Sequence, residues 1–126
     1  MSVAEEADLT KEQAKDLSEH IWNDEGKRDF VLAVSGTISG RKAGLNNDRG
    51  QYPQIGDLEL GKIRVPTLLV HGTADTDVRP DQTDNAAEHI PHAEVIRVTN
   101  GTHLCTWADP ASADIQERIA AVLNGA

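Results

Sequence analysis

The sequence has few of the features that mark disulfide-bonded, membrane-spanning or base-stacking proteins. Its 126 residues include one cysteine, Cys105, so no disulfide can form within the chain, which suits a reducing cytosol. Aromatic residues make up 3% of the chain, too few for a base-stacking platform. Apolar runs fall far short of the ~20 residues that cross a bilayer, and the acidic N-terminus lacks the apolar segment of a signal peptide. We therefore expect a cytoplasmic protein with no membrane partner.

Positive charge is also scarce. Twelve Lys and Arg stand against 21 Asp and Glu, which gives a formal net charge of −9 at pH 7. Such a chain repels phosphate backbones, and no stripe of Lys and Arg interrupts the negative field, so we expect no nucleic-acid partner. The length allows one domain with one modest core.

Residues 1–61 are expected to form a helical and irregular segment. The first ten residues are polar, which predicts a frayed end, and Thr10 and Gln13 then form a capping-box pattern. Apolar residues at helical spacing predict a helix of about three turns after this cap. The side chains expected to face inward from it are Ala14, Leu17, Ile21 and Trp22.

A second helix is predicted from near Asp29 to Gly40. It ends where glycines become frequent, and residues 41–61 are predicted to be a long irregular connection. The side chains expected to face inward from this helix are Phe30, Val31, Val34 and Ile38.

Residues 62–126 alternate between strand and helix patterns. The apolar residues 63–72 predict a strand buried on both faces, and residues 93–98 predict a second strand. Helices are predicted from Pro80 and, with Asp109 as N-cap and a proline after it, near the C-terminus. This order predicts an α/β fold in which a right-handed crossover joins two parallel strands.

Polar loops follow both predicted strands. Asp75 lies four residues after His71 in the first loop, and His103 follows Gly101 in the second. Because parallel strands lie about 4.8 Å apart, these loops can bring an Asp carboxylate to a His imidazole. Such a pair is two-thirds of a nucleophile–His–acid triad. Spacing alone leaves an alternative open, in which Asp75 caps its loop and His103 is a surface histidine.

These residues also resemble a known family. Residues 65–78, Val-Pro-Thr-Leu-Leu-Val-His-Gly-Thr-Ala-Asp-Thr-Asp-Val, resemble the acid-bearing strand and loop of the α/β-hydrolases. Residues 101–103, Gly-Thr-His, resemble the histidine loop of that family, in which Gly-Gly-His is common. The resemblance covers residues 62–123, and residues 27–61 resemble the tail of a lid segment that some members insert. It implies the C-terminal half of an α/β-hydrolase, carrying the family's last two strands.

The resemblance also implies roles. Asp75 corresponds to the acid of the triad and His103 to the general base, and Asp77 is the nearest rival for the acid. The complete protein would then hydrolyse a small ester or a related bond through a covalent intermediate. The substrate stays open, because lid and pocket residues set it in this family.

The nucleophile of the family is missing from the sequence. No serine lies in the Gly-x-Ser-x-Gly pattern that places the family's nucleophile on a strand-to-helix turn. Residues 36–40, Gly-Thr-Ile-Ser-Gly, come nearest, but the spacing differs and Ser39 is expected at a helix end. Cys105 is expected to be a buried structural cysteine rather than a partner of His103. We therefore expect negligible hydrolysis by this chain alone.

The pattern predicts no metal and no cofactor. His89, His92 and His103 could suggest a metal site, but Pro91 breaks the helical spacing and no further ligands complete a set of four. No glycine-rich phosphate loop is found. Trp107 is expected to pack against the last helix rather than to stack on a ligand.

Two parallel strands cannot cover their own faces and edges, so either the N-terminal segment folds over the exposed face or the chain associates with another chain, which we favour. We expect either self-association or a complementing chain, through the open edge of the strand at residues 63–70. In the first predicted function, the chain is part of a truncated hydrolase. This hydrolase acts on a small molecule once an N-terminal half completes it. The alternative is a non-catalytic binding or oligomerisation module built on the hydrolase half-fold.

Overall fold

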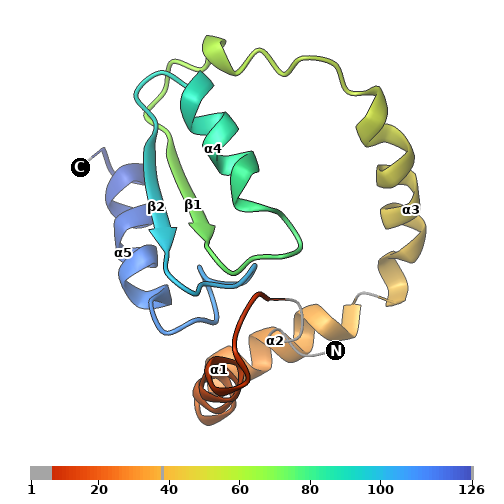
Figure 1. The fold of residues 1–126 in the computed structure, drawn as a ribbon, viewed down its shortest axis with the longest axis vertical. Helices are drawn as coiled ribbons and strands as arrows, with labels where there is room; N and C mark the ends of the chain where they lie inside the picture. Colours follow the sequence, from red (N-terminus) through yellow and green to blue (C-terminus); the bar gives the residue numbers. More distant parts are fainter. Residues whose placement is uncertain (1–6, 38, 126) are drawn as a thin grey trace.

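A computed structural model describes residues 7–37 and 39–125, apart from the side chain of Ser39. The predicted inward position of Ile38 and the first six residues lie outside this range. The chain forms helices and strands in an alternating order in its second half (Figure 1). The elements are α1 (Lys11–Asn23), α2 (Glu25–Thr37), α3 (Lys42–Gln51), β1 (Leu68–Gly72), α4 (Pro80–His89), β2 (Glu94–Val98) and α5 (Ser112–Leu123), with short 3₁₀ turns at Ser39–Arg41, Tyr52–Gln54 and Leu60–Lys62.

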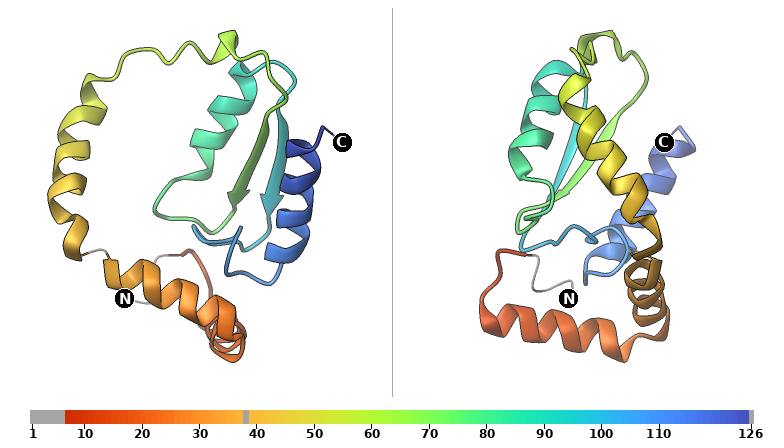
Figure 2. Two further views of the ribbon diagram at one scale, coloured as in Figure 1. Left: turned by 180° about the vertical axis from the view of Figure 1, so that it is seen from behind. Right: turned by 90° about the vertical axis from the view of Figure 1, so that its right-hand side faces the viewer.

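The predicted α/β fold with two parallel strands is confirmed. β1 pairs with β2 in a register that runs from Leu68 opposite Glu94 to Gly72 opposite Val98. α4 connects the strands and covers one face of the sheet, while α5 covers the other (Figures 1 and 2). The core between the sheet and α5 consists of Val98, Cys105 and Ile115, with Val70, Ile96, Ala111 and Ile119 around it.

β1 is shorter and less buried than the sequence predicts. It begins at Leu68, so residues 63–67 precede the strand, and Val65 among them is 67% exposed. Leu68, Leu69 and Val70 are only half-buried. The low burial of β1 follows from the size of the sheet, because β2 is the only strand that pairs with β1 in the described residues. Helices lie over both faces of the sheet, but the outer edge of β1 is open and residues 68–70 stay half-buried, so the expectation of a fully buried strand is wrong for this chain alone.

The start of α1 agrees with the predicted capping box. The Thr10 hydroxyl accepts a hydrogen bond from the Gln13 amide, and the Gln13 side chain accepts one from the Thr10 amide. Leu17 and Ile21 are buried against Ala108, which lies in the loop before α5. The expected inward position of Trp22 is wrong, since this side chain is 65% exposed and lies beneath the Arg28 guanidinium.

Residues 7–9 are not frayed, contrary to the prediction. Ala7 forms an antiparallel bridge with Asp75, and the Asp8 amide donates to the Ala74 carbonyl at 2.8 Å. Leu9 packs against the cluster of Leu17 and Ala108. Residues 7–9 therefore lie directly against the loop that carries the predicted acid.

The N-terminal part contains more helix than predicted. α2 begins at Glu25, four residues before the predicted start near Asp29, because the Asp24 carboxylate accepts from the Lys27 amide and caps the helix there. α3 occupies about half of the region predicted to be irregular, despite its two glycines, and it contains no buried residue. It lies away from the sheet in Figure 1. None of the helices in the described ranges is long and apolar enough to span a bilayer.

Candidate active site

The loops after the two strands are bound to each other. The Thr73 amide donates to the Val98 carbonyl at 2.9 Å, and the Ala74 amide donates to the Gly101 carbonyl at 2.9 Å. A Cβ atom on Gly72 would lie 2.2 Å from the Gly101 oxygen, so this close approach requires glycine. The parallel register thus brings the two predicted site loops together at the carboxyl ends of the strands.

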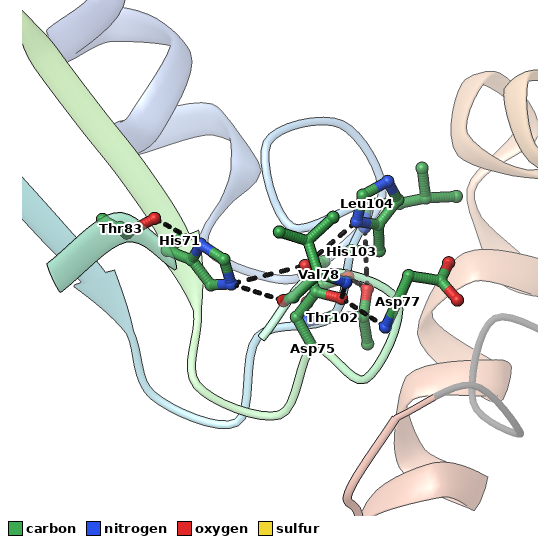
Figure 3. A network of polar contacts seen from close by, with 9 residues as sticks. His71, Asp75, Asp77, Val78, Thr83, Thr102, His103 and Leu104 are labelled. Carbon is green, nitrogen blue, oxygen red and sulfur yellow. Dashed lines mark hydrogen bonds and ion pairs between the residues drawn. The ribbon is translucent and has the colours of Figure 1, made fainter. Parts of the chain in front are cut away.

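Asp75 and His103 are in contact, as the sequence predicts. Nδ1 of His103 lies 3.0 Å from Oδ2 of Asp75 (Figure 3). Oδ1 of Asp75 accepts from the amides of Asp77 and Val78 at 2.9 and 3.0 Å, which fixes the carboxylate. The Asp75 side chain is 5% exposed, whereas the His103 side chain is 47% exposed. A buried carboxylate thus orients a half-exposed imidazole, whose Nε2 lies on the opposite edge of the ring.

Asp77, the rival for the acid, takes a different place. Its backbone amide supports Asp75, and its carboxylate points away from that of Asp75 (Figure 3). The geometry therefore favours Asp75 as the partner of the histidine.

A second histidine, His71, also lies near the Asp75 carboxylate. In the sequence, His71 stood out only as part of the strand motif before Asp75. Its Nε2 lies 2.9 Å from the Val78 carbonyl and 3.5 Å from Oδ2 of Asp75. Its Nδ1 lies 2.6 Å from the Thr83 hydroxyl on α4. Because a carbonyl only accepts, Nε2 carries a proton, and in the neutral ring Nδ1 then accepts from the Thr83 hydroxyl. His71 is buried and ties the acid loop to α4.

Asp109 holds the histidine loop (residues 101–103) through hydrogen bonds to Thr102. Oδ2 of Asp109 accepts from the Thr102 amide at 2.7 Å, and Oδ1 accepts from the Thr102 hydroxyl at 2.9 Å. The prediction that Asp109 caps the last helix is wrong, because α5 begins at Ser112 with Ala111 as its N-cap. Thr102, the departure from Gly-Gly-His, supplies a hydroxyl that glycine lacks. Sequence reasoning missed this role of Asp109.

Cys105 is buried at 4% exposure, in agreement with the expected structural cysteine. Burial raises the pKa of its thiol, and the negative charge of Asp109 and then that of Asp75 raise it further. A thiol held protonated is a poor nucleophile. In the described part of the chain no serine or cysteine hydrogen-bonds to His103, and the Ser39 side chain lies outside that part.

Two other candidate residues, Trp107 and His89, have their contacts with other parts of the chain. Trp107 is 54% exposed, and its ring lies 5.9 Å from that of Phe30 on α2, so its packing partner is α2 rather than the last helix alone. His89 bonds through Nδ1 to the Asn85 carbonyl. The described residues contain no group of three or more His, Cys, Asp or Glu side chains placed to hold a metal ion.

Comparison with solved structures identifies the fold. An α/β-hydrolase fold protein from Nakamurella multipartita is similar to this chain with a TM-score of 0.90 and 38% sequence identity. This chain has a partial α/β-hydrolase fold. The match covers 96% of this chain and 43% of that one, so the partial hydrolase fold spans less than half the length of its relative. Neither a protein-family model nor a curated protein matches the sequence.

Proposed function

We propose that this chain supplies the acid and the base of a nucleophile–His–acid triad in an α/β-hydrolase. The observation that carries the proposal is the 3.0 Å contact between His103 and the buried Asp75 carboxylate. The complete enzyme would hydrolyse a small-molecule ester or a related bond. Its place would be the cytoplasm, in keeping with the single free cysteine.

The contact supports the following proton positions in the proposed reaction. The Asp75 carboxylate accepts from Nδ1–H of His103, so Nε2 carries a lone pair. Nε2 takes the proton of the nucleophile as that group attacks the ester carbonyl, and the Asp75 charge stabilises the imidazolium. His103 then gives this proton to the leaving alkoxide, which leaves an acyl-enzyme. Water activated by Nε2 hydrolyses the acyl-enzyme and restores the starting state.

The nucleophile and the oxyanion donors are proposed to come from a complementing chain. The partial coverage of the related hydrolase fold protein supports this, since the remaining 57% (100 − 43) has no counterpart here. The outer edge of β1 is where such a chain would continue the sheet. The segment before residue 62 is proposed to be the tail of a lid. By this proposal the chain alone hydrolyses no ester at a measurable rate.

Hydrolysis of a short-chain p-nitrophenyl ester tests the proposal. The chain is assayed alone and mixed with the part of the Nakamurella protein that it does not match. We expect turnover only in the mixture. There, Asp75→Asn lowers kcat by about 10⁴-fold, because His103 loses the partner that fixes its tautomer. Asp77→Asn is the matched control, and kcat is expected to change little because that carboxylate does not face Asp75. A mixture that forms a complex without turnover would contradict the proposal.

A non-catalytic binding or oligomerisation module is the second candidate, and the surface beside β1 favours it. A groove of about 420 Å³ lies there, lined mainly by apolar side chains that include Leu68, Val70, Val122 and Leu123. Such a groove on a free strand edge suits a second copy of the chain as well as a complementing one.

A further inference from the structure

The carboxylate of Asp109 is almost completely buried at 3% exposure and is engaged on both oxygens by one residue. Oδ2 accepts from the amide of Thr102 and Oδ1 from its hydroxyl. The same hydroxyl also accepts from the Leu104 amide at 3.2 Å. Both neighbours of His103 are therefore linked to Asp109: Thr102 by direct hydrogen bonds, and Leu104 through the Thr102 hydroxyl oxygen.

The turn that carries Asp109 is itself fixed from two elements. The Ser112 amide at the start of α5 donates to the Asp109 carbonyl at 3.0 Å. Lys27 of α2 donates from Nζ to the same carbonyl at 3.2 Å and to the Ser112 hydroxyl at 2.5 Å. These bonds hold the turn around Asp109 from residues outside the histidine loop, in addition to the backbone bond from the Ala108 amide to the Leu104 carbonyl at 2.9 Å.

His103 needs such support from its backbone. Its side chain is 47% exposed, so packing does not hold the ring, and its only polar anchor in the described residues is Oδ2 of Asp75. A shift of about 1 Å in a catalytic group can lower a rate about 10²-fold. Burying a carboxylate is costly unless its oxygens are hydrogen-bonded, and here both oxygens are used on the residue before His103.

We propose that Asp109 is a positioning residue, which through Thr102 holds Nδ1 of His103 against Asp75. The proposal rests on the proposed role of His103 as the base. Asp109 acts through the backbone of residues 102–104 and does not contact the substrate. Its effect is on which ring nitrogen of His103 carries the proton, because the bond to Asp75 selects Nδ1–H.

The test is an NMR measurement of the His103 ring nitrogens in the full chain, at a pH where the imidazole is neutral. We expect the proton on Nδ1 in the unsubstituted protein. Asp109→Asn loses one acceptor and places an amide donor against the donors of Thr102. We expect the Nδ1–H signal to be lost and Nε2–H to become the major form. Asp114→Asn, an exposed aspartate on α5, makes the same charge change and is expected to leave the tautomer unchanged.

Two further variants make the result decisive if Asp109→Asn fails to fold. Thr102→Val removes the hydroxyl and keeps the amide, and it is expected to shift the tautomer in the same direction. Thr102→Ser keeps the hydroxyl and is expected to retain Nδ1–H. A folded Asp109→Asn or Thr102→Val protein that keeps the proton on Nδ1 would overturn the proposal. The measurement needs no turnover, so it can succeed or fail independently of the esterase assay.

Discussion

At the scale of single residues, Cys105 links the site to the stability of the fold. Burial raises the pKa of its thiol, and the carboxylates of Asp109 and Asp75 add to this effect. In the unfolded chain the thiol ionises above about pH 8.5, whereas in the folded chain it stays protonated to a higher pH. The unfolded state therefore loses its proton first, and the free energy of unfolding must fall as the pH rises through this range.

We expect this loss to be absent from Cys105→Ala, which has no thiol to ionise. The free energy of unfolding is measured by urea denaturation between pH 7 and pH 10 for both proteins. The difference in the free energy of unfolding between the two proteins is expected to be constant below about pH 8. Above that pH, the unsubstituted protein is expected to lose stability relative to Cys105→Ala. A difference that stays constant up to pH 10 would show that the folded chain does not hold the thiol protonated.

Asp75 and His103 could be predicted from the sequence, whereas the residues that hold them in place, His71 and Asp109, could not. Asp75 and His103 follow strands whose parallel order puts their loops together, so sequence spacing and the family resemblance both lead to them. His71 and Asp109 act through side-chain hydrogen bonds to residues that are near in space. In the sequence, an aspartate before a proline near a helix is typical of an N-cap, and only the structure shows that it faces Thr102 instead.

At the scale of elements, the close approach of the two site loops makes a sharp prediction about glycine. In Gly72→Ala the new Cβ would lie 2.2 Å from a backbone oxygen, which no side-chain rotation can relieve. We expect the free energy of unfolding to fall by about 3 kcal/mol or more.

The matched control is Gly44→Ala in α3, where a Cβ meets nothing within 4 Å. Alanine favours a helix over glycine by up to about 1 kcal/mol, so no loss of stability is expected. Urea denaturation of both variants measures the contrast. Equal stabilities for Gly72→Ala and the unsubstituted chain would mean that the two loops are not locked together.

The elements themselves were predicted best where tertiary packing agrees with local pattern. The capping box of α1 and the alternation of β1, α4, β2 and α5 have clear sequence signals and a shared core. α3 was missed because glycines at Gly44 and Gly50 are typical of loops, and no buried face contradicts that interpretation. β1 was predicted too long because apolar residues such as Val65 resemble buried strand residues although here they are exposed.

At the scale of the whole molecule, the chain exposes more apolar surface than its own elements can cover. Among the described residues, eight large apolar side chains are more than half exposed: Trp22, Leu32, Tyr52, Ile55, Leu58, Val65, Trp107 and Leu123. Leu123, at 81% exposure, lies beside the groove along β1. An open strand edge next to an apolar groove is the kind of surface that pairs with another chain. We expect this surface to drive association even without the complementing chain.

Sedimentation velocity over a range of protein concentrations measures that association. We expect the mean sedimentation coefficient to rise with concentration. Leu123→Glu adds a negative charge at the rim of the groove, at the exposed end of α5, so it is expected to weaken association without unfolding the chain. Leu32→Glu changes an exposed leucine of α2 in the same way, away from this groove, and is expected to associate as before. If the chain stays monomeric at every concentration and melts cooperatively, the β1 edge needs no cover. The main physical argument for a complementing chain would then be lost.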